Sequence, residues 1–445
     1  MDPLGPFEPK PRLAVAVSGG ADSVALTLLA AAWARERGGS VHGLVVDHGI
    51  RPEAASEASV TVARLGARAI GATSLRLALA PALSRGEREG STACPLSRLR
   101  ERDEMRVSAE RARAARYAAI ESACIGLGIV HLLLGHHAGD QAETVLMRRL
   151  SRSGPAGLAG MAALRETMYL RLLRPLLPVP PARLRATLRA AGMDWVDDPS
   201  NTDLRALRPR LRTKLADCNS EAPGLLAEAA EYGNRRARAE GEVARFLARQ
   251  VTITPEGFAV LPPGPVPEGA LSALIQAIGG RPFPPPREQT ARLGACPCPA
   301  TLAGTRLLSA GRIGPGFLLM REEREVGDPV PASPGAVWDN RFRLPASASP
   351  PPGAELGPLA ADSVRFRRLS NLPSAILRVL PAIRCGSALF AVPHLGYPDA
   401  ASCARVPVLF SPPRPAACAR FFPVPGQPSA ACGGWGCERT GGSLC

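Results

Sequence analysis

The feature that most constrains the fold is a glycine turn between a strand-like and a helix-like segment near the start of the chain. Residues 12–17 (RLAVAV) form an apolar run of buried-strand length, and the run VALTLLAAAWA that begins at Val24 has helical composition. Between them stands SGGADS, residues 18–23. A strand that turns directly into a helix is typical of β-α-β units, so this order predicts an α/β fold.

Short apolar runs alternate with longer helix-forming segments through the first half of the chain. We predict strands over residues 12–17, 41–46, 69–77 and 129–134, and helices over residues 23–37, 53–65, 107–124 and 141–152. Such alternation indicates a doubly wound parallel sheet, Rossmann-like, with helices on both faces. We assign it to residues 1–215, with residues 80–105 as a flexible surface insertion.

The second half has a different composition, because 31 of the 46 prolines fall in residues 251–445. We therefore expect less regular structure there. Residues 216–330 are predicted to hold a helical linker, with a helix within residues 221–250, and a small further region. Residues 331–429 form a divergent C-terminal region, and residues 430–445, rich in glycine and cysteine, a disordered tail.

The SGGADS loop has the composition of a phosphate-binding turn. Adjacent glycines let the backbone bring N–H groups against a phosphate, and the following helix N-terminus adds partial positive charge. Ser18 and Ser23 can donate hydroxyls, and Asp22 suits a magnesium ion that bridges to the phosphates. The alternative is a Gly-Gly turn in which Asp22 or Ser23 only caps the helix. Walker and dinucleotide spacings are both missing.

A second group of polar residues follows the predicted strand 129–134, at the end where open α/β sheets bind ligands. Asp140 and Glu143 are three apart and share one helix face. Carboxylates beside a nucleotide loop can hold magnesium or accept a proton, and His136 can transfer charge near neutral pH. Helix capping is the alternative for a carboxylate here, and a hydrogen-bonded wall residue the alternative for the histidine.

The charge distribution favours a polyanionic partner such as RNA. The net charge is +15, and residues 144–214 carry fourteen basic and five acidic residues, which places +9 in that segment. No apolar run approaches the roughly 20 residues of a spanning helix. Eleven cysteines without a C-x-x-C pair suggest free thiols in a reducing compartment. We therefore expect a cytoplasmic protein.

SGGADS resembles the S-G-G-x-D-S loop of the N-type ATP pyrophosphatases, or PP-loop ATPases. Across about residues 12–215 the chain resembles one branch of them, the tRNA(Ile)-lysidine synthase family. The further segments that carry the resemblance, in family order, are VVDHGIR (45–51), ERARAARYAA (110–119), GHHAGDQAETVLMRRLSRSGPAGLAGM (135–161), LLRPLLPVP (172–180) and WVDDPSNTDLRALRPRLR (195–212). The fold implied is adenine nucleotide alpha-hydrolase-like.

The resemblance implies an ATP-dependent ligase with Mg²⁺. It would adenylate O2 of the wobble cytidine, position 34 of the CAU anticodon of tRNA(Ile), and join free L-lysine to C2 to give lysidine. Decoding then changes from AUG to AUA, and charging from methionine to isoleucine. The small region within residues 216–330 would bind tRNA. The resemblance implies neither a membrane nor a protein partner, apart from a second copy in a homodimer.

The same resemblance suggests roles for residues of both polar groups, and the basic segment adds arginines that can bind phosphates and unpaired bases. The candidates are, for catalysis, Asp22, Arg116, His136, Asp140 and Glu143; for ATP, Ser18, Gly19, Gly20, Ala21, Asp22 and Ser23; for metal, Asp22 and Asp140; and for tRNA, Arg148, Arg149, Arg152, Arg205, Arg208 and Arg212. The segment from residue 154 to 161 is predicted to be a mobile loop near the substrate.

Two positions depart from the family pattern: Gly139 replaces an acidic or amide residue, and Pro209 replaces an asparagine. Two other functions stay open. One is a PP-loop enzyme that thiolates tRNA, for which Cys94 and Cys124 would be a poor cysteine pair. The other is a catalytically inactive tRNA-binding homologue.

Overall fold

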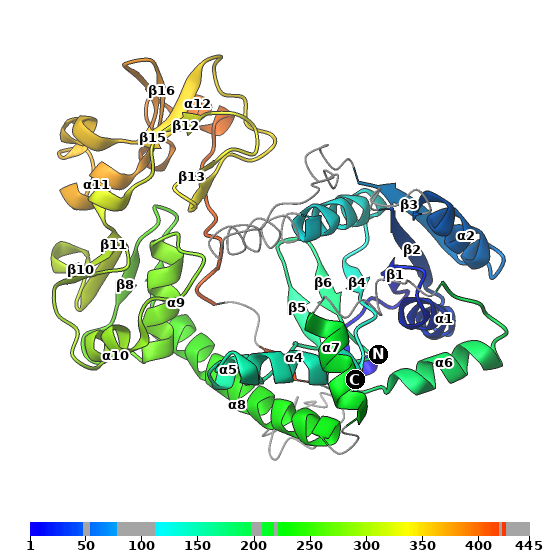
Figure 1. Ribbon diagram of the computed structural model, residues 1–445. Coiled ribbons are helices and arrows are strands. Elements are labelled where there is room, and N and C mark those ends of the chain that lie inside the picture. The colour runs from blue at the N-terminus through cyan, green and yellow to red at the C-terminus, as the bar shows by residue number, and fades with distance from the viewer. Residues whose placement is uncertain (48–53, 78–111, 197–206, 218–220, 418–420, 424–445) are drawn as a thin grey trace, which may run out of the picture. The chain divides into compact units, whose positions relative to one another are not determined.

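The computed structural model describes residues 1–47, 54–77, 112–196, 207–217, 221–417 and 421–423 (Figure 1). The predicted insertion and the predicted tail lie outside these residues. The chain forms two compact units. The first takes in Met1–Ala237 and the segment that begins at Phe421, and the second takes in Arg238–Arg420. None of the described helices is both long and apolar enough to cross a bilayer.

A six-stranded sheet forms the centre of the first unit. Its strands are β1 (Arg12–Val17), β2 (Ser40–Asp47), β3 (Gly71–Arg76), β4 (His131–Leu133), β5 (Leu164–Glu166) and β6 (Arg171–Leu173). The strand order is β3-β2-β1-β4-β6-β5, and only the β5–β6 pair is antiparallel. The four predicted strands are thus present and parallel, although β4 covers only three residues of the predicted run 129–134; β5 and β6 were not predicted.

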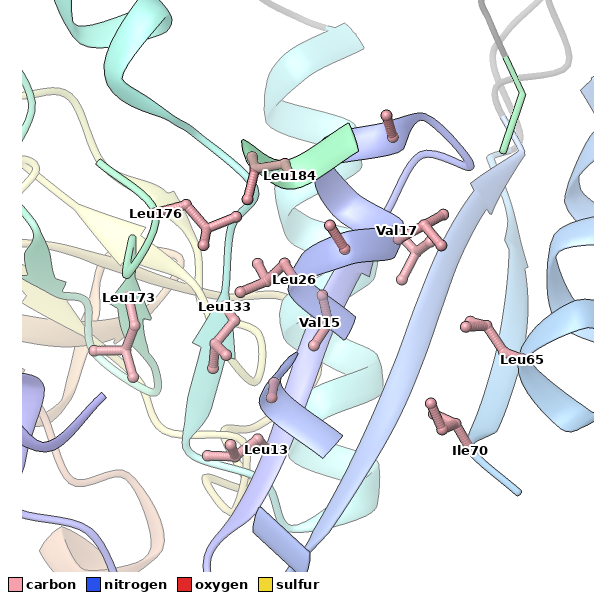
Figure 2. Packing of buried hydrophobic residues seen from close by; sticks show 14 of the residues in the cluster. Leu13, Val15, Val17, Leu26, Leu65, Ile70, Leu133, Leu173, Leu176 and Leu184 are labelled. Carbon is pink, nitrogen blue, oxygen red and sulfur yellow. The ribbon is translucent and has the colours of Figure 1, made fainter. Parts of the chain in front are cut away.

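Helices cover both faces of this sheet, which confirms the doubly wound prediction. Those whose buried residues pack with its strands are α1 (Ala21–Arg35), α2 (Ala54–Gly66), α6 (Pro181–Ala190) and a helix over residues 112–127. The other helices are α4 (Ala138–Leu150), α5 (Pro155–Leu158), α7 (Leu207–Asp217) and α8 (Glu221–Gln250), and residues of α7 and α8 pack with α4. Leu13, Val15 and Val17 of β1 pack with buried residues of α1, α2 and α6 (Figure 2). Ala14, which points to the other face, packs with Ile120 of helix 112–127.

The second unit is built from short antiparallel strands, so the expected change in regularity after the first unit is confirmed. One sheet has the order β7-β8-β11-β10-β9, a second β12-β15-β16-β17 and a third β13-β14-β18. The strands are β7 (Thr252–Ile253), β8 (Ala259–Leu261), β9 (Ala300–Leu302), β10 (Thr305–Ser309), β11 (Phe317–Arg321), β12 (Val330–Pro331), β13 (Val337–Trp338), β14 (Phe342–Arg343), β15 (Ala354–Pro358), β16 (Pro381–Cys385), β17 (Ala388–Ala391) and β18 (Leu409–Phe410). The helices are α9 (Glu268–Ile278), α10 (Arg287–Ala295), α11 (Ser374–Val379) and α12 (Ala400–Arg405).

Candidate active site at the switch point of the sheet

The candidate site lies where the strand order of the first unit reverses. β1 pairs with β2 on one side and β4 on the other, so the carboxyl ends of β1 and β4 border the crevice in which open α/β sheets bind ligands. Gly135, just after β4, lies against the start of α1: a Cβ at this position would be 3.2 Å from both N and Cα of Ser23. Glycine therefore allows the two predicted polar groups to lie side by side.

The SGGADS loop is held in shape from within. Gly19 has a φ of +83°, a conformation that side chains disfavour, and its carbonyl accepts a 2.9 Å hydrogen bond from Val196 N. Ser23 Oγ donates to Gly20 O at 3.0 Å and lies 3.2 Å from Ser18 Oγ. Gly20 precedes α1, which no side chain among the described residues caps. Its first N–H groups, beginning with the buried Ala21, are thus available to an anion.

His137, which the sequence analysis did not single out, joins the two halves of the site. It is the N-cap of α4: its Nδ1 accepts a 3.0 Å hydrogen bond from Gly139 N. The proton therefore belongs on Nε2, which lies 3.5 Å from Asp22 Oδ2 and 3.6 Å from Asp140 Oδ2. Asp140 in turn accepts a 3.0 Å bond from His137 N. Both carboxylates converge on one imidazole.

The glycine at position 139 has a local explanation. A Cβ there would lie 2.9 Å from Cε1 and 3.1 Å from Nδ1 of His137, so a larger residue would displace the imidazole ring. The sequence signal for this cap is a histidine directly before the predicted helix, here His137, followed two positions later by a glycine, here Gly139.

Glu143 is a buried carboxylate with one strong partner. Its side chain is 2% exposed, and Oε1 accepts a 2.8 Å hydrogen bond from Nε of Arg212, a residue of α7. Nη2 of Arg212 also lies 3.9 Å from Asp140 Oδ1. Glu143 Oε2 is buried and has no hydrogen-bond partner among the described residues. We call Asp22, Asp140 and Glu143 the acidic cluster; Arg212 supplies part of its counter-charge.

His136 feels the positive charge of nearby arginines, of which Arg174 acts most strongly. Burial first, and then the positive charge of Arg174, lowers the pKa of His136 to about 4, so its imidazole is neutral at pH 7. Arg174 is itself buried, and its Nη1 donates to Ala162 O at 2.8 Å. Burial also lowers the pKa of Arg116. Nε of Arg116, Nε of Arg174 and Nδ1 of His136 are buried, and in the described part of the chain they meet no hydrogen-bond partner.

The site suits a magnesium ion whose coordination shell a nucleotide completes. Asp22 and Asp140 approach one another through His137 Nε2. Mg²⁺ is usually bound through one or two carboxylates together with substrate phosphates. No group of three or more His, Cys, Asp or Glu side chains in the described residues could hold a metal by itself. The residues thus fit a Mg²⁺ ion that is coordinated both by these carboxylates and by the phosphates of a bound nucleotide.

The six arginines predicted to contact tRNA have different surroundings. Arg148 and Arg152 are exposed at the end of α4 and just beyond it. Arg149 forms an ion pair with Glu228 of α8. Arg208 is exposed on α7, and its charge acts on His136. Arg212 lies against the acidic cluster, and Arg205 is outside the described residues.

The loop predicted to be mobile contains the one-turn helix α5 and is fixed at its end. Gln141 Oε1 accepts from Met161 N at 2.8 Å, and Gln141 Nε2 donates to Met161 O at 3.2 Å. Gly160, with a φ of +66°, gives the amide room, because a Cβ there would be 2.8 Å from it. A buried glutamine on α4 thus ties this segment to the site helix, which the sequence pattern did not reveal.

The cysteine on which a thiolation mechanism would depend is a core residue. Cys124 is completely buried in helix 112–127 among Ile120, Leu132 and other apolar residues. Burial raises the pKa of its thiol to about 11, so it is protonated and poorly nucleophilic at neutral pH. Cys94 lies outside the described residues.

Comparison with known proteins identifies relatives of this arrangement. A PP-loop domain family matches residues 2–218. A tRNA(Ile)-lysidine synthase of Ruegeria pomeroyi is 33% identical over 417 residues, 87% of this chain and 90% of that protein. Those of Bradyrhizobium diazoefficiens and Rhodopseudomonas palustris are 42% and 43% identical, over 52% and 47% of this chain. The chain spans 59% and 55% of the length of these two relatives.

Proposed function

The chain belongs to the tRNA(Ile)-lysidine synthase family, and we propose that it joins lysine to C2 of the wobble cytidine in the CAU anticodon of tRNA(Ile), consuming ATP and releasing AMP and diphosphate. The observation that carries the proposal is the meeting of Asp22 and Asp140 at His137 Nε2, directly beside a phosphate-type loop. An enzyme that adenylates its substrate needs carboxylates close to the loop that binds the ATP phosphates, because they can hold the metal ion that neutralises phosphate charge. We expect the reaction to take place in the cytoplasm, where its tRNA substrate is found.

In the first step O2 of the cytosine attacks the α-phosphorus of ATP, and the bond to the β-phosphate breaks to release diphosphate. The free N–H groups of α1 and the hydroxyls of Ser18 and Ser23 would bind phosphate oxygens. Arg116 and Arg174 carry buried donors that remain available for the charge that develops on phosphate or base. Neutral His136, on which the charge of Arg174 acts, can accept a hydrogen bond without adding charge.

Asp22 and Asp140 are the residues that would hold Mg²⁺. A bound ion would neutralise phosphate charge and orient the triphosphate. His137 fixes the orientation of both carboxylates through Nε2, and its own orientation is fixed by the helix it caps.

In the second step the amine of lysine attacks C2, the bond from C2 to the adenylated oxygen breaks, and AMP leaves with the electron pair. The acidic cluster provides the negative charge that attracts a lysine ammonium, and Glu143 Oε2 is a buried acceptor without a partner among the described residues. A carboxylate there can also take the proton that the amine must lose before it attacks.

One incubation tests this proposal. Purified protein is mixed with unmodified tRNA(Ile), ATP-Mg and radiolabelled lysine, and both AMP and tRNA-bound label are measured. We expect AMP release that depends on tRNA, with one label per tRNA. A tRNA that carries guanosine in place of the wobble cytidine is the matched control and should stay unlabelled.

Two outcomes would contradict the proposal. AMP release that does not depend on lysine and leaves the tRNA unlabelled would indicate another adenylating enzyme, such as one that thiolates tRNA. Tight tRNA binding without any ATP cleavage would indicate an inactive homologue.

A further inference from the structure

The chain returns to the first unit after completing the second, and it does so at the edge of the six-stranded sheet. Residues 421–423, here called the return segment, lie at β5, the edge strand of the catalytic sheet. Phe422 forms an antiparallel bridge with Leu164, and Phe422 O accepts a 2.9 Å hydrogen bond from Ala163 N. The return segment thereby satisfies part of an edge that would otherwise be open.

Residues of α8 contact the return segment as well. Phe421 is 6% exposed, and the guanidinium of Arg236 on α8 lies 4.5 Å from the centre of its ring. Gly233, one turn earlier on α8, leaves space for that ring, because a Cβ there would be 3.2 Å from it. Nη1 of Arg236 also donates to Ala156 O in α5 at 3.2 Å. The segment is therefore held between β5 and α8.

Residues 162 and 163, next to the return segment, hold Arg174 through two hydrogen bonds. Arg174 N donates to Ala163 O and Arg174 Nη1 donates to Ala162 O, both at 2.8 Å. Met161, just before these two residues, is clamped by Gln141 of the site helix. A continuous line of contacts thus runs from Phe422 through Ala163 to Arg174, whose charge acts on His136.

We infer that the return segment positions the active site: by fixing Ala162 and Ala163 it holds Arg174 at the place where the reaction's negative charge develops. This inference rests on the proposed function, because it assigns the segment to the adenylation step. Shifts of about 1 Å in a catalytic group can cost about 100-fold in rate, so a brace of this kind affects the chemical step more than binding. The return segment acts through Arg174 and is a positioning element, not a catalytic one.

Truncation provides the main test. Three chains are compared: the full chain, one that ends at Pro423 and keeps the return segment, and one that ends at Arg420 and lacks it. We expect the first two to release AMP at equal single-turnover rates and the third to be at least about tenfold slower, with the KM for tRNA changed by less than about twofold. Equal rates for all three chains would overturn the inference.

Point variants keep the test valid if the shortest chain fails to fold. Phe421→Tyr preserves an aromatic ring under Arg236, whereas Phe421→Ala removes it. We expect the tyrosine variant to retain the rate and the alanine variant to lose it at temperatures where both remain folded by circular dichroism. A loss that only follows the unfolded fraction would mean that the segment is merely structural, which contradicts the inference.

Two further readouts separate positioning from stability and from the proposed function. If Arg174 shifts, its charge lowers the pKa of His136 less, so the acidic limb of the pH–rate profile should move to higher pH in Phe421→Ala.

Hydrogen exchange at Ala163 N reports the hydrogen bond from Ala163 N to Phe422 O and needs no activity. If the full chain fails to incorporate lysine, the proposed function fails. Unchanged protection of Ala163 in the chain that ends at Arg420 overturns the inference independently.

Discussion

Arg212 Nε donates a 2.8 Å hydrogen bond to Glu143 Oε1 across 69 positions of sequence, and the carboxylate that receives it is almost completely buried. The contact joins α7 to the site helix α4, and the apolar residues Leu211 and Val145 pack in the same cluster. A buried carboxylate without counter-charge is costly, so this single ion pair links the stability of the first unit to the charge balance of its site.

Replacing Arg212 with methionine should therefore destabilise the first unit. We expect a loss of about 1–3 kcal/mol in the free energy of unfolding, moderated because Arg212 is 47% exposed. Urea denaturation measures it. Arg208→Met, on the same helix but exposed, is the control and should change stability by less than about 0.5 kcal/mol. A double variant with Glu143→Gln should recover part of the loss; strict additivity of the two changes would refute the coupling.

Gly139→Ala should damage the site without damaging the helix. The new Cβ would lie 2.9 Å from Cε1 of His137, which must move and release Asp22 and Asp140. The displaced imidazole also gives up its N-cap bond from Gly139 N, a loss of about 1 kcal/mol that the higher helix propensity of alanine, also about 1 kcal/mol, offsets. We expect lysine incorporation to fall at least about tenfold with little change in the melting temperature. Gly126→Ala, in a helix with open space around it, should leave incorporation intact. Full activity of Gly139→Ala would show that the imidazole position is not needed.

The lowered pKa of His136 predicts a pH dependence of stability. Between about pH 4, the value in the folded chain, and about pH 6.5, the ordinary value, the unfolded chain binds more protons. The free energy of unfolding should therefore fall as the pH drops from 6.5 toward 4. His136→Asn removes this contribution, so its urea midpoint should change less than that of the unmodified chain between pH 7 and pH 5. Parallel pH curves for the two chains would rule out a buried neutral His136.

Asp22→Ala should separate chemistry from binding. This variant loses a candidate metal ligand and the partner of His137, so AMP release should fall by about 1,000-fold or more. Binding of tRNA, measured by filter retention, should remain within about threefold because the predicted arginine contacts are elsewhere. Glu36→Ala, at the far end of α1, is the matched acidic control and should behave normally. Normal turnover by Asp22→Ala would remove Asp22 from the mechanism.

The sequence was most informative where one residue type determines the local backbone. The turn at Gly19 and Gly20, and the four predicted strands, could be predicted because apolar runs and glycines mark them directly; β4 has only three residues but lies within the apolar run 129–134. β5 and β6 could not be predicted, since they are equally short and no such run marks them. They are stabilised by neighbours distant in sequence, Leu133 on one side and Phe422 on the other.

For the site, the sequence indicated which segments matter but not how their side chains pair. Of two adjacent histidines, His136 was selected, yet His137 is the one that contacts both carboxylates. The choice depends on which ring faces α1, and the contact of His137 Nε2 with Asp22 joins residues 115 positions apart, which the local pattern does not reveal. Arg212 was assigned from charge alone to tRNA; its nearest partners are carboxylates, and a role in tRNA binding stays a prediction.

The return segment has a consequence for synthesis on the ribosome. Everything needed for the phosphate loop and the acidic cluster has been translated by Arg212, but Phe422 emerges only after the whole second unit. A prematurely terminated polypeptide would then carry the reactive groups without the brace at Ala163. If the return segment sets the rate of adenylation, incomplete chains release AMP only slowly. Fragments that cannot complete the modification of a tRNA would then consume little ATP.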